Sequence, residues 1–338
     1  MAGTVLVSGG SGYIAGFLIR QLVAEGWTVR TTVRSLAGEE AVRQRLAVDN
    51  SRLTFFAAEL LSDAGWAEAT AGCSHVAHVA SPVPAGVPKD PNEVIAPARD
   101  GVLRVLRAAK AARVKRFVMT SSVAAIAYGR GRGVHHFTES DWTDLSKPGL
   151  SPYIHSKTLA ERAARDWVAK EGGGLELVSI CPSVVLGPVW SRDYSASVVV
   201  VKKLLDGSLG ACPDIGFGVV DVRDLADLHV RALQTPGIAG ERFIANDRFL
   251  KLRDVADILR AQLSAQAHKV TTRNAPDWAV RIAALFVPVA RAVVGELGSV
   301  RHQSAAHAKD VLGWATRPAE QSIVDTARAL LDLGIVKV

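Results

Sequence analysis

Apolar residues recur along the first half of the chain in two alternating patterns. Short apolar and β-branched runs such as residues 4–8 and 28–33 predict buried strands, whereas residues 12–25 carry apolar side chains at helical spacing. A strand, a helix and a second strand therefore open the chain. Further strands are predicted at 53–57, 73–80, 116–121 and 175–181, and helices at 98–112 and 152–170. Strands that alternate with helices pair in parallel, which predicts a doubly wound α/β sheet of the Rossmann class.

The regular alternation ends near residue 187, and this position divides the chain into two parts. Residues 1–187 are predicted to form the sheet domain, which residues 217–247 rejoin with a further strand and helix. Residues 188–216 and 248–338 are predicted to form a smaller C-terminal lobe that contacts the substrate.

Residues 278–294 are strongly apolar, but Arg281, Pro288 and Arg291 interrupt them. The segment falls short of the roughly twenty unbroken apolar residues that a membrane span needs, so no contact with a membrane is predicted. A helix pair in the lobe core or at a dimer interface is one interpretation. A hydrophobic wall over a substrate pocket, with Trp278 in it, is the other.

Composition and charge exclude several classes of protein. Of the 338 residues, 49% are hydrophobic and 22% are charged, which favours a globular protein over a disordered one. The net charge of +7 would suit nucleic acid, but the basic residues are dispersed. Those between residues 99 and 116 alternate with apolar residues at helical spacing, which is typical of a solvated helix face. No nucleic-acid partner is predicted.

The cysteines and histidines offer no sign of a metal site. Cys73, Cys181 and Cys212 are far apart and match neither a disulfide framework nor a zinc spacing. His75 and His78 stand three apart in a predicted strand and so point to opposite faces. No metal is expected. The first residues lack the pattern of a signal peptide, so we expect a cytoplasmic protein, and the sequence leaves a homodimer open.

A glycine-rich segment joins the first predicted strand to the first predicted helix. It follows a Gly-x-x-Gly-x-x-Ala pattern, in which glycines allow the backbone to approach a pyrophosphate and the helix N-terminus meets its charge. A small residue, Ala15, lets the helix pack closely against the strand. The residues expected to hold a dinucleotide here are Gly9, Ser11, Gly12, Tyr13 and Ile14.

The end of the second strand indicates which dinucleotide is bound. A carboxylate at this position binds the ribose of NAD, whereas an arginine accommodates the 2′-phosphate of NADP. The sequence after residue 30 is Thr-Thr-Val-Arg-Ser, without an acid. Arg34 is therefore the predicted 2′-phosphate ligand, and Arg43 is a second candidate. The predicted cofactor is NADP(H).

Three polar residues form a candidate catalytic set. Tyr153 and Lys157 lie four residues apart on a helix that Ser151 caps and Pro152 begins, so both side chains share one face. A nearby ammonium and an oxidised nicotinamide would lower the pKa of the phenol and suit it to proton transfer. Ser122 ends a strand at the carboxyl edge of the sheet, where it can hold a substrate oxygen beside Tyr153.

With these motifs the whole chain resembles the extended short-chain dehydrogenase/reductases. Within them it is similar to the dihydroflavonol reductase, cinnamoyl-CoA reductase and aldehyde reductase group. The resemblance rests on residues 8–16, 33–34, 78–83, 120–122, 153–157 and 181–188.

The resemblance implies further contacts with the cofactor. It places Val79, Ala80 and Ser81 at the ribose, Glu59 and Leu60 at the adenine, and Pro182, Val185 and Ser197 at the nicotinamide end. Glu59 stands where the family usually has Asp. Ala127 stands where plant flavonoid reductases carry Asn or Asp, which implies a more apolar pocket than theirs.

The sequence thus predicts an NADPH-dependent, reversible reductase of ketones or aldehydes with hydrophobic or aromatic substrates. The pocket is expected to include Val123, Tyr194 and Trp278. The alternatives are an NAD-dependent nucleotide-sugar epimerase or dehydratase, a steroid dehydrogenase, and a non-catalytic NADP sensor. Arg34 disfavours the epimerase, and the complete set of Ser122, Tyr153 and Lys157 disfavours the sensor.

Overall fold

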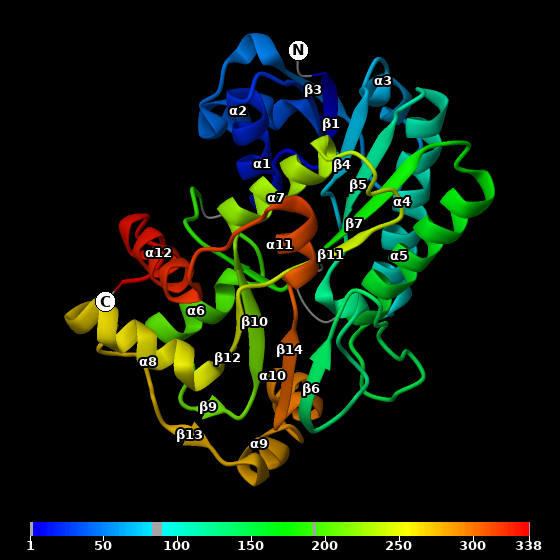
Figure 1. The fold of residues 1–338 in the computed structure, drawn as a ribbon. Helices are drawn as coiled ribbons and strands as arrows, with labels where there is room; N and C mark the ends of the chain where they lie inside the picture. The colour runs from blue at the N-terminus through cyan, green and yellow to red at the C-terminus, as the bar shows by residue number, and fades with distance from the viewer. Residues whose placement is uncertain (1–2, 83–89, 192–193, 338) are drawn as a thin grey trace.

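Seven parallel strands form the centre of the computed structural model, which describes residues 3–82, 90–191 and 194–337 (Figure 1). The order across the sheet is β3-β2-β1-β4-β5-β7-β11. These strands are β1 Thr4–Val7, β2 Thr28–Val33, β3 Leu53–Ala57, β4 His75–His78, β5 Arg116–Thr120, β7 Glu176–Pro182 and β11 Arg242–Ala245. The doubly wound α/β prediction is confirmed. The order reverses between β1 and β4, where such sheets bind ligands outside the carboxyl ends of the strands.

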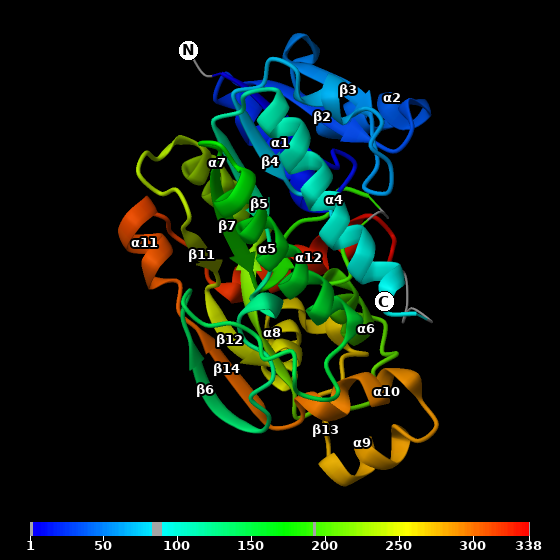
Figure 2. The same ribbon diagram turned by 90° about the vertical axis from the view of Figure 1, so that its right-hand side faces the viewer.

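Helices cover both faces of this sheet. Figure 2 looks onto the face that carries α4 and α5, and α1 and α7 pack on the opposite face. The helices around the sheet are α1 Tyr13–Ala24, α2 Glu39–Leu46, α3 Trp66–Thr70, α4 Asn92–Ala111, α5 Pro152–Glu171, α7 Val222–Gln234 and α11 Ala306–Leu312. Helix α4 begins at Asn92, earlier than the predicted residue 98, and Pro97 lies inside it. The buried side chain of Val94 extends the apolar face of the helix toward its N-terminus.

A smaller lobe follows the sheet domain. Its strands form three small sheets: β12-β10-β8, β13-β9 and β14-β6. They are β6 Gly133–Phe137, β8 Val184–Leu186, β9 Cys212–Pro213, β10 Gly216–Asp221, β12 Arg248–Lys251, β13 Asn274–Ala275 and β14 Ser299–Gln303. The helices are α6 Val198–Leu205, α8 Leu252–Leu263, α9 Asp277–Ala283, α10 Pro288–Val293 and α12 Ala319–Asp332.

The chain crosses between the two parts more often than its pattern suggests. β6 and β8 precede residue 187 but pair with strands of the lobe, β14 and β10. Helix α7 and strand β11 follow residue 187 in the chain but belong to the sheet domain. Trp314, which comes later still, packs into the core beneath α7. Short elements of this kind carry no signal in the sequence for the sheet they join.

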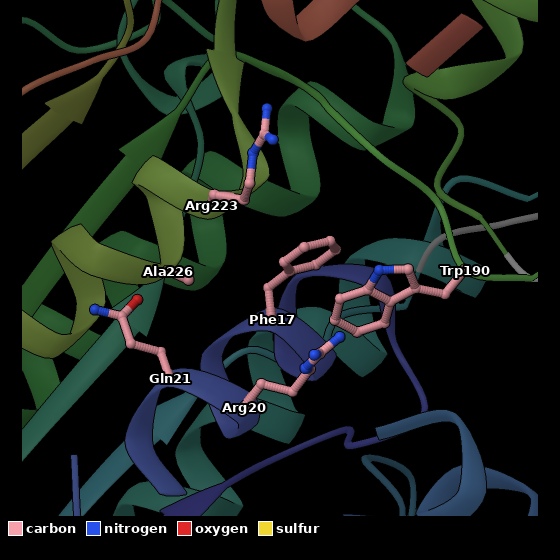
Figure 3. A pocket seen from close by; sticks show the side chains of 6 residues that line it. All are labelled: Phe17, Arg20, Gln21, Trp190, Arg223 and Ala226. Carbon is pink, nitrogen blue, oxygen red and sulfur yellow. The ribbon is translucent and has the colours of Figure 1, made fainter. Parts of the chain in front are cut away.

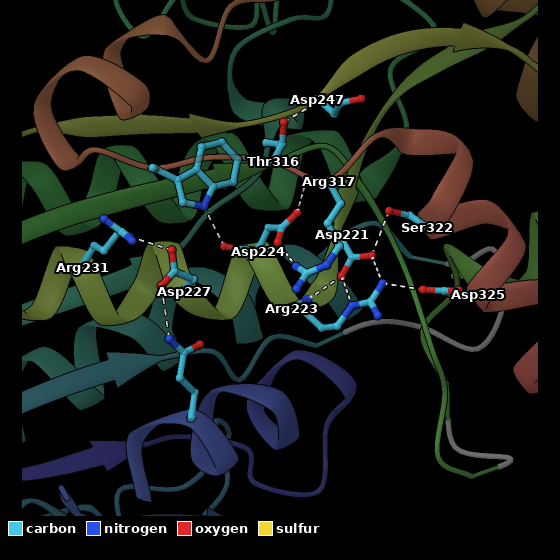
Figure 4. A network of polar contacts seen from close by, with 12 residues as sticks. Asp221, Arg223, Asp224, Asp227, Arg231, Asp247, Thr316, Arg317, Ser322 and Asp325 are labelled. Atoms are coloured by element: carbon cyan, nitrogen blue, oxygen red, sulfur yellow. Dashed lines mark hydrogen bonds and ion pairs between the residues drawn. The ribbon is translucent and has the colours of Figure 1, made fainter. Parts of the chain in front are cut away.

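A polar network joins α7 to the lobe (Figure 4). Asp221 caps α7 by accepting a hydrogen bond from the Arg223 backbone N–H at 2.8 Å. The Arg223 guanidinium bridges Asp221 and Asp325 of α12, at 2.8 and 2.6 Å. The Ser322 hydroxyl donates to Asp221 Oδ2 at 2.8 Å. The start of α7 is thereby fixed to α12.

The apolar segment at residues 278–294 forms α9 and α10, which contact each other. Along α9 only Val280 is buried, whereas Trp278 is 65% exposed and Ile282 53% exposed. Both views place α9 at the end of the lobe away from the seven-stranded sheet (Figures 1 and 2). The lobe-core interpretation of this segment is therefore wrong, because its larger apolar side chains face outward.

Within residues 3–82, 90–191 and 194–337, no helix is long and apolar enough to cross a membrane. No group of three or more His, Cys, Asp or Glu side chains in these ranges could hold a metal ion.

The contact between β8 and α12 predicts a stability effect. The buried Thr326 hydroxyl accepts a hydrogen bond from the Gly187 N–H at 2.7 Å, so Thr326→Val leaves that N–H unsatisfied. We expect the free energy of unfolding in urea to fall by about 1–3 kcal/mol. Thr54→Val, on the exposed side of β3, is the control and should change it by less than about 0.5 kcal/mol. Equal changes in the free energy of unfolding for the two variants would refute a stabilising role of the hydrogen bond between Gly187 and Thr326.

Candidate active site

The glycine segment forms a tight turn between β1 and α1. Gly9 has a φ of 75°, and its N–H donates to Thr32 Oγ1 at 3.0 Å. The Gly10 N–H donates to the Thr32 carbonyl at 2.8 Å. A Cβ on Gly10 would lie 2.2 Å from Thr31 Oγ1, and one on Gly9 would lie 3.1 Å from the Cβ of Ala80. Only glycine fits at position 10, because a Cβ there would overlap the Thr31 side chain.

The N-terminus of α1 follows this turn directly. Ser11 and Gly12 are exposed, and no side chain in the described part of the chain caps the helix. The first backbone N–H groups of α1, including those of Tyr13 and Ile14, can therefore meet an anion. The Tyr13 ring packs 5.7 Å from the Phe17 ring, and burial raises the pKa of its phenol.

Ser8 fixes the segment after β4 beside the glycine turn. Its Oγ accepts hydrogen bonds from the N–H groups of Val79 and Ala80, each at 3.0 Å. Its own proton is then directed to His78 Nδ1, at 3.0 Å. Burial lowers the pKa of His78 to about 3, so the imidazole is neutral and can accept this bond. Val79, Ala80 and the half-buried Ser81 lie where strand order reverses, as a ribose contact requires.

Three arginines lie near the predicted phosphate site. Arg34 is exposed just beyond β2, and within the described ranges it takes part in no ion pair. Arg43 instead donates to Glu39 at 2.7 Å and lies 4.8 Å from the Phe55 ring. Arg45, which sequence reasoning missed, donates to the Ser11 carbonyl at 2.7 Å and so ties α2 to the glycine turn. Arg34 remains the better placed for a 2′-phosphate.

The predicted adenine contacts follow β3 at the same edge of the sheet. The Glu59 side chain is exposed, and its carbonyl accepts a hydrogen bond from Trp66 Nε1 at 3.1 Å. The Leu60 carbonyl accepts from Arg104 at 2.9 Å, and the Leu60 side chain packs against Gly101 of α4. Both residues are thus held in place through their backbones, while the Glu59 carboxylate stays free to meet a ligand.

The structure brings Ser122, Tyr153 and Lys157 together. Ser151 caps α5 by accepting from the Ile154 N–H at 3.3 Å, and Pro152 begins the helix, as predicted. Ser122 follows β5, its Oγ accepts a hydrogen bond from the Ala124 N–H at 3.1 Å, and its hydroxyl is close enough to the Tyr153 phenol to affect the pKa of that phenol. Lys157 is buried and donates to the Thr120 carbonyl at 3.2 Å.

Desolvation and neighbouring groups act on the ionisation of this set. Tyr153 is 37% exposed, yet desolvation of its phenol raises the pKa, and the interaction with Ser122 opposes the rise only in part. Burial also lowers the pKa of Lys157 to about 8, although Cys181 and Glu161 act to raise it. The lowering of the phenol pKa by the Lys157 ammonium together with an oxidised nicotinamide stays a prediction.

The residues expected at the nicotinamide end lie on neighbouring segments. Pro182 ends β7, Val185 lies in β8 and Ser197 directly precedes α6. Val185 is 5% exposed and packs into the core between the sheet and α1, so little of its side chain can meet a ligand. Pro182 pairs with Ala245 at the carboxyl edge.

The predicted substrate residues do not gather around the triad. Val123 is 8% exposed and packs with Ile126 and Phe137 in a small core behind Ser122. Tyr194 packs against the core of the lobe. Trp278 of α9 is 65% exposed, so its position does not support the pocket-wall interpretation.

A polar pair that sequence reasoning missed lies next to Ala127. Ala127 is fully buried, and the following phenol, Tyr128, interacts electrostatically with Arg301 and Tyr153. The Arg301 guanidinium lies 4.4 Å from the Tyr128 ring and pairs with Glu296. Polar groups therefore lie close to the position that Ala127 leaves apolar. Tyr128 and Arg301 are 173 positions apart along the chain, and no local motif predicts their contact.

A separate hollow of about 390 Å³ lies between α1 and α7 (Figure 3). The Trp190 indole stacks on Phe17 with ring centroids 3.8 Å apart, and the Arg20 guanidinium lies 4.9 Å from the same indole. Its lining residues are Phe17, Arg20, Gln21, Trp190, Arg223 and Ala226. None of them belongs to the triad or the glycine turn, so this hollow is not the catalytic cleft.

Fold and site together define a class of protein. A doubly wound sheet with a glycine turn at its strand reversal, and with Ser122, Tyr153 and Lys157 at its carboxyl edge, is a Rossmann-type dinucleotide-binding protein. The chain belongs to the NAD dependent epimerase/dehydratase family, which matches residues 5–244. The resemblance to the extended short-chain dehydrogenase/reductases is confirmed at this level.

Proteins with similar sequences include reductases from plants. The chain is 35% identical over 268 residues to the cinnamoyl-CoA reductase CAD2 of Medicago truncatula, covering 77% of this chain and 81% of that reductase. It is 32% identical to the dihydroflavonol 4-reductase of Gerbera hybrida, covering 76% of this chain and 72% of that reductase.

Solved structures share the fold over nearly the whole length. Yeast methylglyoxal/isovaleraldehyde reductase Gre2, solved with NADPH, superposes with a TM-score of 0.80 at 24% identity and covers 98% of this chain and 100% of its own. Vestitone reductase from alfalfa gives a TM-score of 0.77 at 24% identity, covering 99% and 100%.

The close fit around Gly10 predicts a loss of nucleotide binding. In Gly10→Ala the new methyl group overlaps Thr31, so the turn must shift. We expect NADPH, used as the probe, to bind about tenfold or more weakly, since overpacking costs about 1–3 kcal/mol. Gly38→Ala, where a Cβ would meet nothing within 4 Å, should bind NADPH normally in the same fluorescence titration. Unchanged binding by Gly10→Ala would contradict the assignment of the turn.

Proposed function

We propose that this protein is an NADP(H)-dependent oxidoreductase that reversibly reduces ketones or aldehydes to alcohols. The observation that carries the proposal is the contact between the Ser122 hydroxyl and the Tyr153 phenol at the carboxyl edge of the sheet. Lys157 lies one helical turn further along the same face of α5. Relatives named as reductases support the same reaction class.

The residues present fit a nicotinamide dinucleotide phosphate. Side chains are excluded at Gly10, and the uncapped N-terminus of α1 offers N–H groups to a pyrophosphate. Arg34 would bind the 2′-phosphate, and no acid competes at the end of β2. When bound, this cofactor supplies or accepts the hydride. The neighbour Gre2 was solved with NADPH, which agrees with this choice.

The protein's own groups handle the substrate oxygen and its proton. Ser122 and Tyr153 both hydrogen-bond to the carbonyl oxygen and orient it. As the carbonyl carbon is reduced, Tyr153 donates its phenolic proton to that oxygen, which becomes the alcohol hydroxyl. The Lys157 ammonium stabilises the phenolate left behind, and the reverse sequence serves alcohol oxidation.

The walls of the site favour a substrate that carries a second oxygen. Tyr128 and Arg301 add a polar group next to Tyr153, whereas Val123 and Ile126 are buried in the core behind Ser122. A nucleotide-sugar epimerase or a steroid dehydrogenase would use the same triad. Turnover of NADPH with aryl ketones, aldehydes, dihydroflavonols and steroid ketones, followed by absorbance, separates these functions. Binding of the cofactor without oxidation on any carbonyl would favour the epimerase or a sensor.

Tyr153→Phe tests the proton donor. The variant keeps the ring but removes the proton, so we expect kcat to fall by at least about a hundredfold. The affinity for NADPH should stay within about twofold, because the phenylalanine ring preserves the packing. Steady-state turnover and fluorescence titration measure the two quantities. Near-normal turnover would exclude Tyr153 as the donor.

Arg34→Ala tests the cofactor preference. Loss of charge-assisted hydrogen bonds to a phosphate should weaken NADPH binding about 10- to 100-fold and leave NADH binding unchanged. Arg43→Ala is the matched control, because that arginine is already paired with Glu39. If Arg43→Ala impairs NADPH binding and Arg34→Ala does not, the second candidate is the phosphate ligand.

A further inference from the structure

A buried ion pair that the proposed reaction does not use lies behind the triad. Glu161 follows Lys157 by four residues on α5, and its side chain is fully buried. Arg242 of β11, 5% exposed, donates from Nε to Glu161 Oε1 at 2.7 Å and from Nη2 to Oε2 at 3.3 Å. In this fork-like contact the guanidinium compensates the carboxylate inside the protein.

Glu161 also holds the residue before the catalytic serine. The Ser121 hydroxyl donates to Glu161 Oε2 at 2.5 Å, and the Ser121 N–H donates to the Ile180 carbonyl at 2.7 Å. Ser121 is thus fixed through both its side chain and its backbone. The position of Ser122 relative to α5 depends on these two contacts.

Arg242 extends the same network to the segment after β6. Its Nη1 donates to the carbonyls of Glu139 and Asp141 at 2.6 and 2.8 Å, and its guanidinium lies 3.9 Å from the Trp142 ring. The next residue, Thr143, donates to the Ala124 carbonyl at 2.7 Å. Arg242 is therefore linked, through Trp142 and the neighbouring Thr143, to the segment that follows Ser122.

We propose that Glu161 and Arg242 are positioning residues for the reduction proposed above, on which this inference rests. Glu161 holds the Ser121–Ser122 strand end against α5 and, through its negative charge, keeps Lys157 protonated. Arg242 holds the carboxylate in place for both tasks. Neither side chain needs to contact the substrate or the cofactor.

The charges around Lys157 support the electrostatic part of this role. Three groups act on it: Glu161 on its own helix, Cys181 of β7 and His78 of β4. Burial raises the pKa of the Cys181 thiol and lowers that of His78 to about 3, so both are uncharged at neutral pH. The Glu161 carboxylate, which is paired with Arg242, is therefore the group that offsets part of the desolvation lowering the pKa of Lys157 to about 8.

Glu161→Gln tests the proposal through the pH profile. Removing the carboxylate makes Lys157 lose its proton at lower pH, so the alkaline limb of kcat should move down by about half a unit or more. We expect kcat at neutral pH to fall by about tenfold, since misplacement of Ser122 affects the reaction. KM for NADPH should change by less than about twofold, because no cofactor contact is lost.

A matched ion pair at the opposite end of the same sheet provides the control. Arg116, at the start of β5, donates to Glu176 at 2.7 Å and to the Ala232 carbonyl at 3.0 Å. Glu176→Gln also breaks an Arg–Glu pair, but at the amino edge, away from Ser122. Glu176→Gln should lower the free energy of unfolding and leave the alkaline limb of the pH profile of kcat unchanged. A shift of the same size in both variants would overturn the proposal.

A second variant separates positioning from a folding defect, because Glu161→Gln leaves Arg242 buried without its partner. Glu161→Gln/Arg242→Met removes both charges and should fold while keeping the shifted limb. NMR titration of carbon-13-labelled lysines, with Lys157 assigned from Lys157→Arg, should show the same downward shift without any turnover. An unshifted Lys157 would overturn the proposal. Absence of turnover by the wild-type protein on every carbonyl would instead refute the proposed function alone.

Discussion

The active-site assignment depends on the parallel pairing of the central strands. Because all seven strands run in one direction, their carboxyl ends share a single edge of the sheet. The glycine turn follows β1, the ribose segment follows β4 and Ser122 follows β5, so neighbouring strands deliver the three parts side by side. The reversal between β1 and β4 leaves room there, and the close approach of Gly9 to Ala80 shows how little side-chain volume that space tolerates.

Burial of charge is the second constraint on this edge. Lys157 and Arg242 are cations with less than a tenth of their surface exposed, and such groups persist only when acids or carbonyls compensate them. The protein meets this need with backbone carbonyls and a single buried carboxylate, Glu161, and keeps His78 neutral. A neutral imidazole also suits its contact with Ser8, which sets the backbone of Val79 and Ala80. The same contacts therefore determine both the charges and the positions of the residues at this site.

Local signals in the sequence were sufficient for the fold class, the glycine turn and the triad. Each depends on residues a few positions apart, such as the cap at Ser151 and the i, i+4 spacing of Tyr153 and Lys157. The contacts that the sequence did not predict join distant segments. Examples are Tyr128 with Arg301 and Glu161 with Arg242, in which the partners lie on separate elements. No periodicity relates such residues, so only the folded chain reveals them.

The lobe was predicted less well for a related reason. Helix α9 has apolar residues at helical spacing, which usually marks a face turned to the core, yet its Trp278 and Ile282 are both more than half exposed. Likewise β8 carries the apolar run of a buried strand but pairs outside the central sheet. The hydrophobic pattern shows that one face of a helix or strand is apolar, but it does not show which other element packs against that face.

Proton transfer at this site depends on the ionisation of both Tyr153 and Lys157. A protonated phenol is the form that can donate to a substrate oxygen in carbonyl reduction, and desolvation, which raises the pKa of Tyr153, favours that form. Alcohol oxidation needs the phenolate instead, and its stabilisation requires a protonated Lys157 close by. With the pKa of Lys157 lowered to about 8, that charge is held at neutral pH and lost in mild alkali. The oxidative direction therefore depends on the same buried lysine whose charge Glu161 supports, and Glu161 Oε2 links the Ser121–Ser122 strand end to the helix that carries Lys157.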